Sequence, residues 1–242
     1  AAIIAAAGSG ERLGADIPKA LVQLGGRSLV EYAFAHLSPA VSEIVIAVPA
    51  ESQKEFASLF GDSARIVVGG ATRSSSIQAA LREISSDIDF ILVHDAARPL
   101  ASSALAQRII DELINGEKAV IPVLPVVDTV KKIDAKGYVT ETPDRQMLRA
   151  VQTPQGFAAS VLREAHASAG DATDDAALVE KMGIPVKTID GEVQAMKITT
   201  KDDLAGGGAH QVFAQTGGTH GGADVGAEAL VTHQEGEALG LG

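Results

Sequence analysis

A run of small apolar residues, 2–7, leads into a loop, 8–14, that contains three glycines, and this unit constrains the fold most. The apolar run is typical of a buried strand. The glycines allow the backbone to turn sharply and to approach a ligand closely. Arg12 and Lys19 place two cations beside this loop. Because such charges match the anionic charge of a polyphosphate, the unit predicts an α/β fold whose first loop serves phosphoryl chemistry.

Two common nucleotide-binding motifs fit the glycine loop less well. A dinucleotide fingerprint needs Gly-x-Gly-x-x-Gly, whereas this loop has one residue too many before Gly14. A Walker loop needs Gly-Lys-Ser/Thr, which does not follow. A simple surface turn with an exposed Arg12 and Lys19 stays open as an alternative. Pro18 stiffens the chain just before Lys19, which favours a positioned lysine.

The composition excludes several classes of protein. The 242 residues are 46% hydrophobic and only 3% aromatic, so a large core must be built from Ala, Val, Ile and Leu. The sequence has no cysteine, which rules out disulfides and cysteine-bound metals and fits a cytoplasmic protein. A net charge of −11 argues against nucleic-acid binding. We find no apolar run long enough for a membrane span and no signal peptide, and we expect further residues before Ala1.

Apolar runs alternate with helical patterns along the chain, and this order predicts a mostly parallel sheet with helices on both faces. Strands are expected at 44–49, 64–68, 90–93 and 119–127, and helices at 29–37, 53–60, 75–84 and 104–114. Pro122 and Pro125 predict that the last of these strands bends or lies at a sheet edge. Ligands of such sheets bind at the carboxyl ends of the strands.

Two further motifs follow predicted strands. In the first, Gly69-Gly70 precedes Arg73 and a helix that any of Ser74–Ser76 could cap, so this loop either covers a nucleotide or is only a helix start. In the second, Asp95 ends a strand, where an aspartate commonly binds a metal or a ribose hydroxyl. The alternative is a structural ion pair between Asp95 and Arg98. His94 shows no partner in the sequence and is interpreted as structural.

The remaining segments are less distinctive. Asp134–Gly137 is a turn signal inside 127–145, which predicts a hairpin that projects from the sheet, often a dimerisation arm. Thr173-Asp174-Asp175 has the pattern of a helix N-terminus, and Lys197 is expected in a strand, 196–199. Residues 205–242 contain eleven glycines and no lysine or arginine. We therefore expect one domain over 1–204 and a linker-like tail.

Taken together, these motifs resemble one family, the 2-C-methyl-D-erythritol 4-phosphate cytidylyltransferases of the non-mevalonate isoprenoid pathway. The resemblance covers about 1–204 in family order and rests on Ala6-Ala-Gly-Ser-Gly-Glu-Arg12, Pro18-Lys19, Gly69-Gly70 with Arg73 and Ser76, Val93-His-Asp-Ala-Ala-Arg-Pro99, Asp128-Thr129, Asp144-Arg145, Gln152-Thr-Pro-Gln-Gly-Phe157, Thr173-Asp174 and Lys197-Ile-Thr199. It implies a Rossmann-like nucleotidyltransferase fold with a mostly parallel twisted sheet, flanking helices and a dimerisation arm at about 127–147. It also implies transfer of the cytidylyl group of CTP to 2-C-methyl-D-erythritol 4-phosphate, with release of pyrophosphate.

The resemblance also implies site residues. It assigns CTP contacts to Ala6, Ala7, Gly8, Ser9, Gly10, Gly70, Arg73, Ser76, Asp95 and Ala96. It assigns methylerythritol phosphate contacts to Arg98, Thr129, Arg145, Thr153, Thr173 and Lys197. Arg12, Lys19, Arg145 and Lys197 are the implied catalytic residues. The implied cofactor is Mg²⁺, held by Asp95 together with the CTP phosphates. Because the family's arm crosses to the partner, the resemblance implies a homodimer in which Arg145 completes the neighbouring site.

Three rival functions are weighed against this resemblance. Ribitol-5-phosphate cytidylyltransferases share the loop, but they usually have a bulkier residue where this sequence has Ala97. A non-catalytic nucleotide-binding module would be expected to lose a charge such as Lys19 or Lys197, and both are present. A dehydrogenase is disfavoured by the loop spacing.

Overall fold

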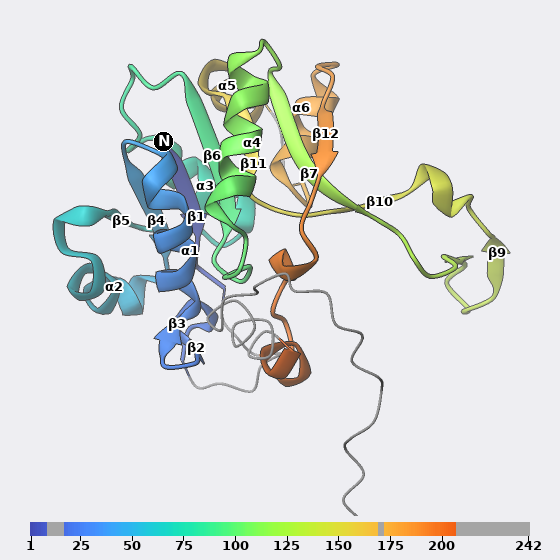
Figure 1. Cartoon of the computed structure of the whole chain (residues 1–242), viewed down its shortest axis with the longest axis horizontal. Coiled ribbons are helices and arrows are strands. Elements are labelled where there is room, and N and C mark those ends of the chain that lie inside the picture. Colours follow the sequence, from blue (N-terminus) through green and yellow to red (C-terminus); the bar gives the residue numbers. More distant parts are fainter. Residues whose placement is uncertain (9–16, 169–171, 207–242) are drawn as a thin grey trace, which may run out of the picture.

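The computed structural model describes residues 1–8, 17–168 and 172–206. Its centre is one sheet in the order β10-β7-β11-β6-β1-β4-β5, with β12 paired to β7 on the other side (Figure 1). The strands are β1 (Ala2–Ala5), β4 (Ile44–Val48), β5 (Arg65–Val68), β6 (Phe90–Asp95), β7 (Ala119–Pro125), β10 (Arg149–Val151), β11 (Gln155–Ala158) and β12 (Lys187–Asp190). Within this sheet β10 and β11 run against the other strands, so the predicted mostly parallel sheet is confirmed.

Helices cover both faces of the sheet. They are α1 (Leu29–Leu37), α2 (Gln53–Phe60), α3 (Arg73–Leu81), α4 (Ser103–Ile114), α5 (Ala159–Ser168) and α6 (Asp175–Lys181). Successive strand residues point to opposite faces. In β1, accordingly, Ile4 packs into a core with Val30 of α1 and Leu105 of α4, whereas Ile3 packs into a second core with Leu162 of α5. Two separate apolar cores thus hold the sheet between the helices.

Of the two alternatives predicted for the 119–127 strand, a bend or a place at the sheet edge, the edge position is wrong. β7 has neighbours on both sides, because β12 pairs with it in parallel and β10 and β11 pair with it in antiparallel. The carbonyl of Pro122 accepts from the N–H of Gln152 at 2.8 Å, so the missing N–H of Pro122 faces the break between β10 and β11. The sheet tolerates this proline because the ladder is already interrupted there.

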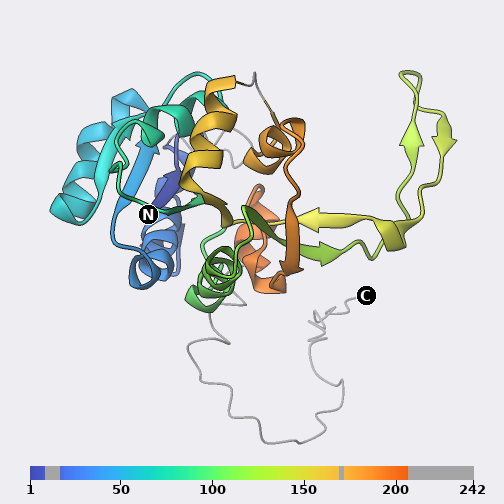
Figure 2. The ribbon, with the colours of Figure 1, turned by 90° about the horizontal axis from the view of Figure 1, so that it is seen from above.

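The predicted hairpin is confirmed as a projecting arm. It consists of β8 (Lys132–Ile133) and β9 (Val139–Glu141), which pair with each other and lie apart from the main sheet (Figure 2). Gly137 adopts a φ of +85° at the turn, and Asp134 accepts hydrogen bonds from the N–H groups of Lys136 and Tyr138. A small separate ribbon, β2 (Gln23–Leu24) and β3 (Arg27–Ser28), precedes α1.

Two local expectations need correction. Thr72, not one of Ser74–Ser76, caps α3, since its side chain accepts from the N–H of Ser75. Residues 196–199 form no strand. The N–H of Ile198 donates a backbone hydrogen bond to the carbonyl of Ala97, which lies just beyond the end of β6. A last helical stretch covers 201–206. The boundary at 204 and the linker-like character of 205–242 stay predictions, because almost all of that tail lies outside the described residues.

Candidate active site

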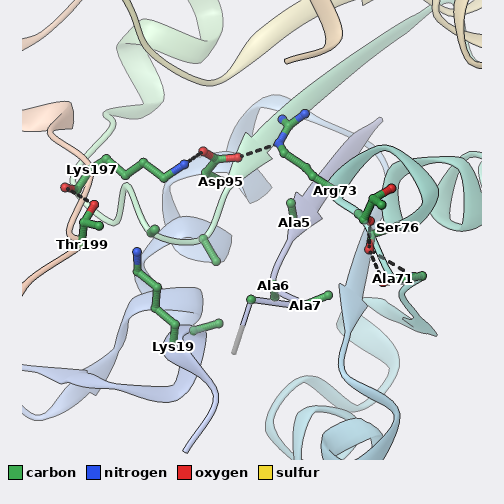
Figure 3. Close-up of a pocket in the computed structure, with 16 residues that line it drawn as sticks. Ala5, Ala6, Ala7, Lys19, Ala71, Arg73, Ser76, Asp95, Lys197 and Thr199 are labelled. Atoms are coloured by element: carbon green, nitrogen blue, oxygen red, sulfur yellow. Dashed lines mark hydrogen bonds and ion pairs between the residues drawn. The ribbon is translucent and has the colours of Figure 1, made fainter. Parts of the chain in front are cut away.

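Residues at and just beyond the carboxyl ends of β1, β5 and β6 line one cavity of about 640 Å³ (Figure 3). Its lining in the described part of the chain is Ala5, Ala6, Ala7, Gly8, Lys19, Ala20, Gly70, Ala71, Thr72, Arg73, Ser76, Asp95, Ala96, Ala97, Lys197 and Thr199. This is the edge at which parallel sheets bind their ligands. The topology therefore brings together three motifs that are far apart in the sequence.

The residues that lead into the first loop, Ala7 and Gly8, lie close to the start of the second loop. The N–H of Ala6 donates to Ala47 at 2.8 Å, which extends β1 towards the cavity, and the N–H of Lys19 donates to the carbonyl of Gly8 at 3.3 Å. A Cβ atom on Gly69 would lie 2.8 Å from Ala7 Cβ, so only glycine permits this close approach. Ser9, Gly10 and Arg12 lie outside the described residues.

Ser76 holds the shape of the second loop. Its hydroxyl accepts from the N–H of Gly70 at 3.1 Å and lies 2.9 Å from the carbonyl of Thr72. A Cβ atom at Gly70 would clash with Ser75, which fixes glycine at this position as well. The backbone of this loop is thus exposed to the cavity in a fixed conformation.

Asp95 lies between two cations in the cavity. Lys197 Nζ is 2.8 Å from Oδ2 of Asp95, and Arg73 Nε is 3.2 Å from Oδ1 (Figure 3). Burial alone would raise the pKa of Asp95, but Arg73 and Lys197 hold it well below its usual range. Asp95 is therefore ionised at neutral pH. The alternative pairing of Asp95 with Arg98 is wrong, because Arg98 donates to the carbonyls of Ala195 and Val151 instead.

His94 has partners that the sequence did not reveal. Its Nε2 lies 3.2 Å from the carbonyl of Arg98, so Nε2 donates and Nδ1 accepts from the hydroxyl of Thr153 at 2.9 Å. Thr153 Oγ1 in turn accepts from the N–H of Asp95 at 3.1 Å. Burial lowers the pKa of His94 to about 4, so the ring is neutral and structural, as interpreted from the sequence. This relay of hydrogen bonds, from the carbonyl of Arg98 through His94 and Thr153 to the N–H of Asp95, fixes the backbone at Asp95.

Several predicted site residues do not line the cavity. Thr153 is buried with both hydroxyl partners inside the protein, Thr173 is exposed, and Arg98 is engaged with backbone carbonyls. Thr129 and Arg145 lie on the arm segment, away from the cavity of their own chain, and Arg145 donates to the carbonyl of Val127. Substrate contact by these five side chains stays a prediction.

The structure also adds residues that sequence reasoning missed. Ala5, Ala20, Ala71, Thr72, Ala97 and Thr199 line the cavity, and their only signal was proximity to a recognised motif. Asp175 is 1% exposed and accepts from Arg73 Nη1 at 2.7 Å. The sequence suggested only a helix N-terminus there, and Asp174 is the residue that fills that role.

One carboxylate suits the implied Mg²⁺. Among the described residues no group of three or more metal-ligating side chains occurs. Magnesium is commonly held by one or two carboxylates together with substrate phosphates. Asp95 fits this mode, because it is ionised, lines the cavity and makes a contact with Lys197 that a phosphate could replace. The residues present fit a metal that arrives with the nucleotide.

Comparison with known proteins agrees with this geometry. The family model described as 2-C-methyl-D-erythritol 4-phosphate cytidylyltransferase matches residues 1–211. The chain belongs to this family. Among its relatives, the 2-C-methyl-D-erythritol 4-phosphate cytidylyltransferase of Nocardia farcinica is 52% identical over 207 residues, which are 84% of this chain and 90% of that protein.

Solved structures show the same fold. The cytidylyltransferase of Thermus thermophilus superposes with a TM-score of 0.74 at 38% identity, covering 87% of this chain and 97% of that one. The 4-diphosphocytidyl-2C-methyl-D-erythritol synthase of Anaerococcus prevotii gives a TM-score of 0.76 at 31% identity, covering 87% and 95%. The predicted fold, family and activity are thereby confirmed. The chain is a nucleotidyltransferase of isoprenoid precursor synthesis that transfers a cytidylyl group to methylerythritol phosphate. Within the described residues, none of the helices is both long and apolar enough to cross a membrane.

Proposed function

We propose that CTP and 2-C-methyl-D-erythritol 4-phosphate bind and react in the cavity at the ends of β1, β5 and β6. The observation that carries this proposal is the placement of Lys19 and Lys197 on one cavity with Asp95 (Figure 3). CTP lies over Ala6, Ala7 and Gly8, with its base at Gly70 and Ser76 and its ribose or metal at Asp95 and Ala96. Ser9 and Gly10 are assigned to the CTP phosphates as well, and Arg73 supports the pocket.

The chemistry requires charge compensation more than proton transfer. A phosphate oxygen of methylerythritol phosphate attacks the α-phosphorus of CTP, and a new P–O bond forms. The bond from the α-phosphorus to the bridging oxygen breaks, and pyrophosphate leaves with the electron pair. The attacking oxygen is already anionic at neutral pH, so no general base is needed. The residues need only hold two anions in line and stabilise the charge of the transition state.

Lys19, Lys197 and Arg12 supply most of that charge in the proposal. Lys197 is 44% exposed at its side chain and can leave Asp95 for a phosphate, because Arg73 still compensates the charge of that carboxylate. Mg²⁺, when bound with the nucleotide, supplies further positive charge to the phosphates. Asp95 would hold that metal together with CTP. Arg98, Thr153 and Thr173 are assigned to the methylerythritol phosphate side.

The arm supports a homodimer. Val127, Ile133, Tyr138 and Met147 expose between 60% and 82% of their surface on this projecting segment. Such a concentration of exposed apolar side chains is typical of a surface that a partner covers. We propose that the arm crosses to a second copy and that Thr129 and Arg145 complete the partner's site. We also propose a cytoplasmic location, which the lack of cysteine in the sequence fits.

The reaction is tested by pyrophosphate release with CTP and Mg²⁺, with methylerythritol phosphate or ribitol 5-phosphate as acceptor. We expect release with methylerythritol phosphate and little with ribitol 5-phosphate. Preference for ribitol 5-phosphate would favour the sibling activity. Binding of CTP without turnover of either acceptor would indicate a nucleotide-binding module. The Lys201→Ala variant is a matched control for Lys197→Ala, because Lys201 is exposed and does not line the cavity.

A further inference from the structure

A chain of alternating charges runs from the cavity into the protein interior. It begins with Lys197 and Asp95, continues through Arg73 of α3, and reaches Asp175 of α6. His166 of α5 ends it, with Nε2 2.9 Å from Oδ1 of Asp175. The end of this path at the cavity is exposed and its inner end is buried, because the side chain of Lys197 is 44% exposed and that of Asp175 is 1% exposed. The part of this chain beyond Arg73 has no role in the chemistry described above.

Asp175 is not needed to start its own helix. Asp174 caps α6, because its side chain accepts from the N–H of Ala177 at 3.0 Å. Asp175 instead turns inward, and its two oxygens are bonded to side chains from α3 and α5. A buried carboxylate is costly unless its charge is compensated, and Arg73 provides that compensation. The pair is therefore a specific contact and not a general preference for acid at a helix N-terminus.

Arg73 holds two carboxylates with different nitrogens. Nη1 lies 2.7 Å from Oδ2 of Asp175, and Nε lies 3.2 Å from Oδ1 of Asp95. The shorter, more buried contact fixes the guanidinium, and the guanidinium then fixes Oδ1 of Asp95. Oδ2 of Asp95 is left to face Lys197 and the cavity. Without Asp175, Arg73 could turn both nitrogens to Asp95 and draw that carboxylate away from the ligand.

We propose that Asp175, held by His166, is a positioning residue that orients Arg73 and through it the ligand-facing oxygen of Asp95. This inference rests on the proposed function in one respect, since it takes Asp95 as a CTP contact. Its effect falls on nucleotide affinity, because neither Asp175 nor His166 reaches the cavity. The experiment therefore measures CTP binding directly, by calorimetry, beside steady-state pyrophosphate release.

Asp175→Asn is the decisive variant because it keeps the shape of the side chain and removes its charge. The amide oxygen can face Arg73 and the amide nitrogen can face His166, which can change tautomer, so folding is expected to survive. We expect the Kd for CTP to rise about tenfold, a magnitude typical of lost outer-shell partners. The kcat at saturating CTP should stay within about twofold, since Asp175 does not contact the reacting atoms.

His166 gives a second, independent test. His166→Gln keeps a donor near the Nε2 position and should bind CTP as the wild type does. His166→Leu leaves Oδ1 of Asp175 without its donor and should weaken CTP binding about threefold. Recovery by the conservative variant is expected of a positioning contact. Equal CTP affinity in all three proteins would overturn the role of His166, and an unchanged Kd in Asp175→Asn would overturn the proposal.

Arg163→Gln separates positioning from general loosening of the same helix. Arg163 of α5 donates to the carbonyls of Leu81, Ile84 and Ser85, so its loss weakens the packing of α5 without removing a member of the charge chain. We expect a lower Tm and an unchanged Kd for CTP. A Kd that rises as much as in Asp175→Asn would overturn the proposal. If the wild type binds CTP without releasing pyrophosphate, the proposed reaction fails, and the Kd comparison still decides this inference.

Discussion

The Nζ atom of Lys197 lies 2.8 Å from Oδ2 of Asp95, although 102 positions separate the two residues in the sequence. The contact joins the last segment before the tail to the end of a central strand. The Lys197 ammonium is partly exposed and can move, whereas the Asp95 carboxylate is held in place by Arg73. In the proposed pose, an incoming phosphate rearranges this contact.

Replacing Lys197 with alanine should affect catalysis far more than stability. The ion pair is partly exposed, so we expect a loss of at most about 1 kcal/mol in the free energy of unfolding. Loss of a charge that stabilises the transition state should lower kcat/KM about 100-fold. Denaturant titration and pyrophosphate release measure the two effects. The Lys201→Ala control should be normal in both, and a kcat/KM within threefold of wild type in Lys197→Ala would contradict the proposed role.

Lys19→Ala should separate chemistry from nucleotide binding. Lys19 lines the cavity beside the glycine loop, where it meets the phosphates of CTP in the proposed pose. A cation that acts mainly on the transition state should lower kcat about 100-fold and change the Kd for CTP less than about threefold. Single-turnover kinetics and calorimetry measure these quantities. Equal losses in kcat and in CTP affinity would show that Lys19 is a ground-state binding residue.

Local patterns predicted the elements whose boundaries are set locally. The helices α1 and α2 begin and end where their apolar spacing predicts, and Gly61 with a φ of +50° stops α2. In contrast, β10 and β11 are short and are defined by their pairing with β7. Nothing in three or four residues specifies such a pairing in advance. The same distant pairing explains why Pro122 proved compatible with a central strand.

The site was predictable as a place but not as a set of contacts. Gly70 comes soon after β5 and Asp95 is the last residue of β6, so the parallel topology alone brings them to the same edge of the sheet. The partners of Asp95 could not be foreseen in the same way. Arg98 is its neighbour in sequence, yet the cations that bind it come from α3 and from the extended segment after β12. Such contacts depend on how the helices and loops pack on the sheet, and local sequence does not encode that packing.

His94 should make stability depend on pH. In the unfolded chain a histidine gains its proton below about pH 6.5, whereas burial lowers the pKa of folded His94 to about 4. Between these values the unfolded state binds more protons, so stability falls as the pH falls. The contribution is complete above the unfolded pKa and is lost towards pH 4, by about 3 kcal/mol at most. Protonation would also break the bond that Nδ1 accepts from Thr153.

Denaturant titrations between pH 4 and pH 8 test this dependence. His94→Gln should be less stable than wild type at pH 7, because the relay to Thr153 and Arg98 is disturbed. It should also lose less stability than wild type as the pH falls to 4. His36, whose pKa is lowered by burial as well, is present in both proteins, so its contribution cancels in the difference. Parallel pH profiles for the two proteins would contradict the buried neutral ring.

The proposed crossing of the arm to the partner subunit predicts how activity depends on the two subunits. If Arg145 completes the partner's cavity, each site combines Lys19 from one subunit with Arg145 from the other. We expect the Lys19→Ala and Arg145→Ala homodimers each to be nearly inactive. A heterodimer of the two variants, purified through two different tags, has one site with both residues intact. It should therefore show about half of the wild-type activity. If Arg145 instead served the site of its own chain, every site in the heterodimer would lack one residue, and the activity would stay at the level of the inactive homodimers.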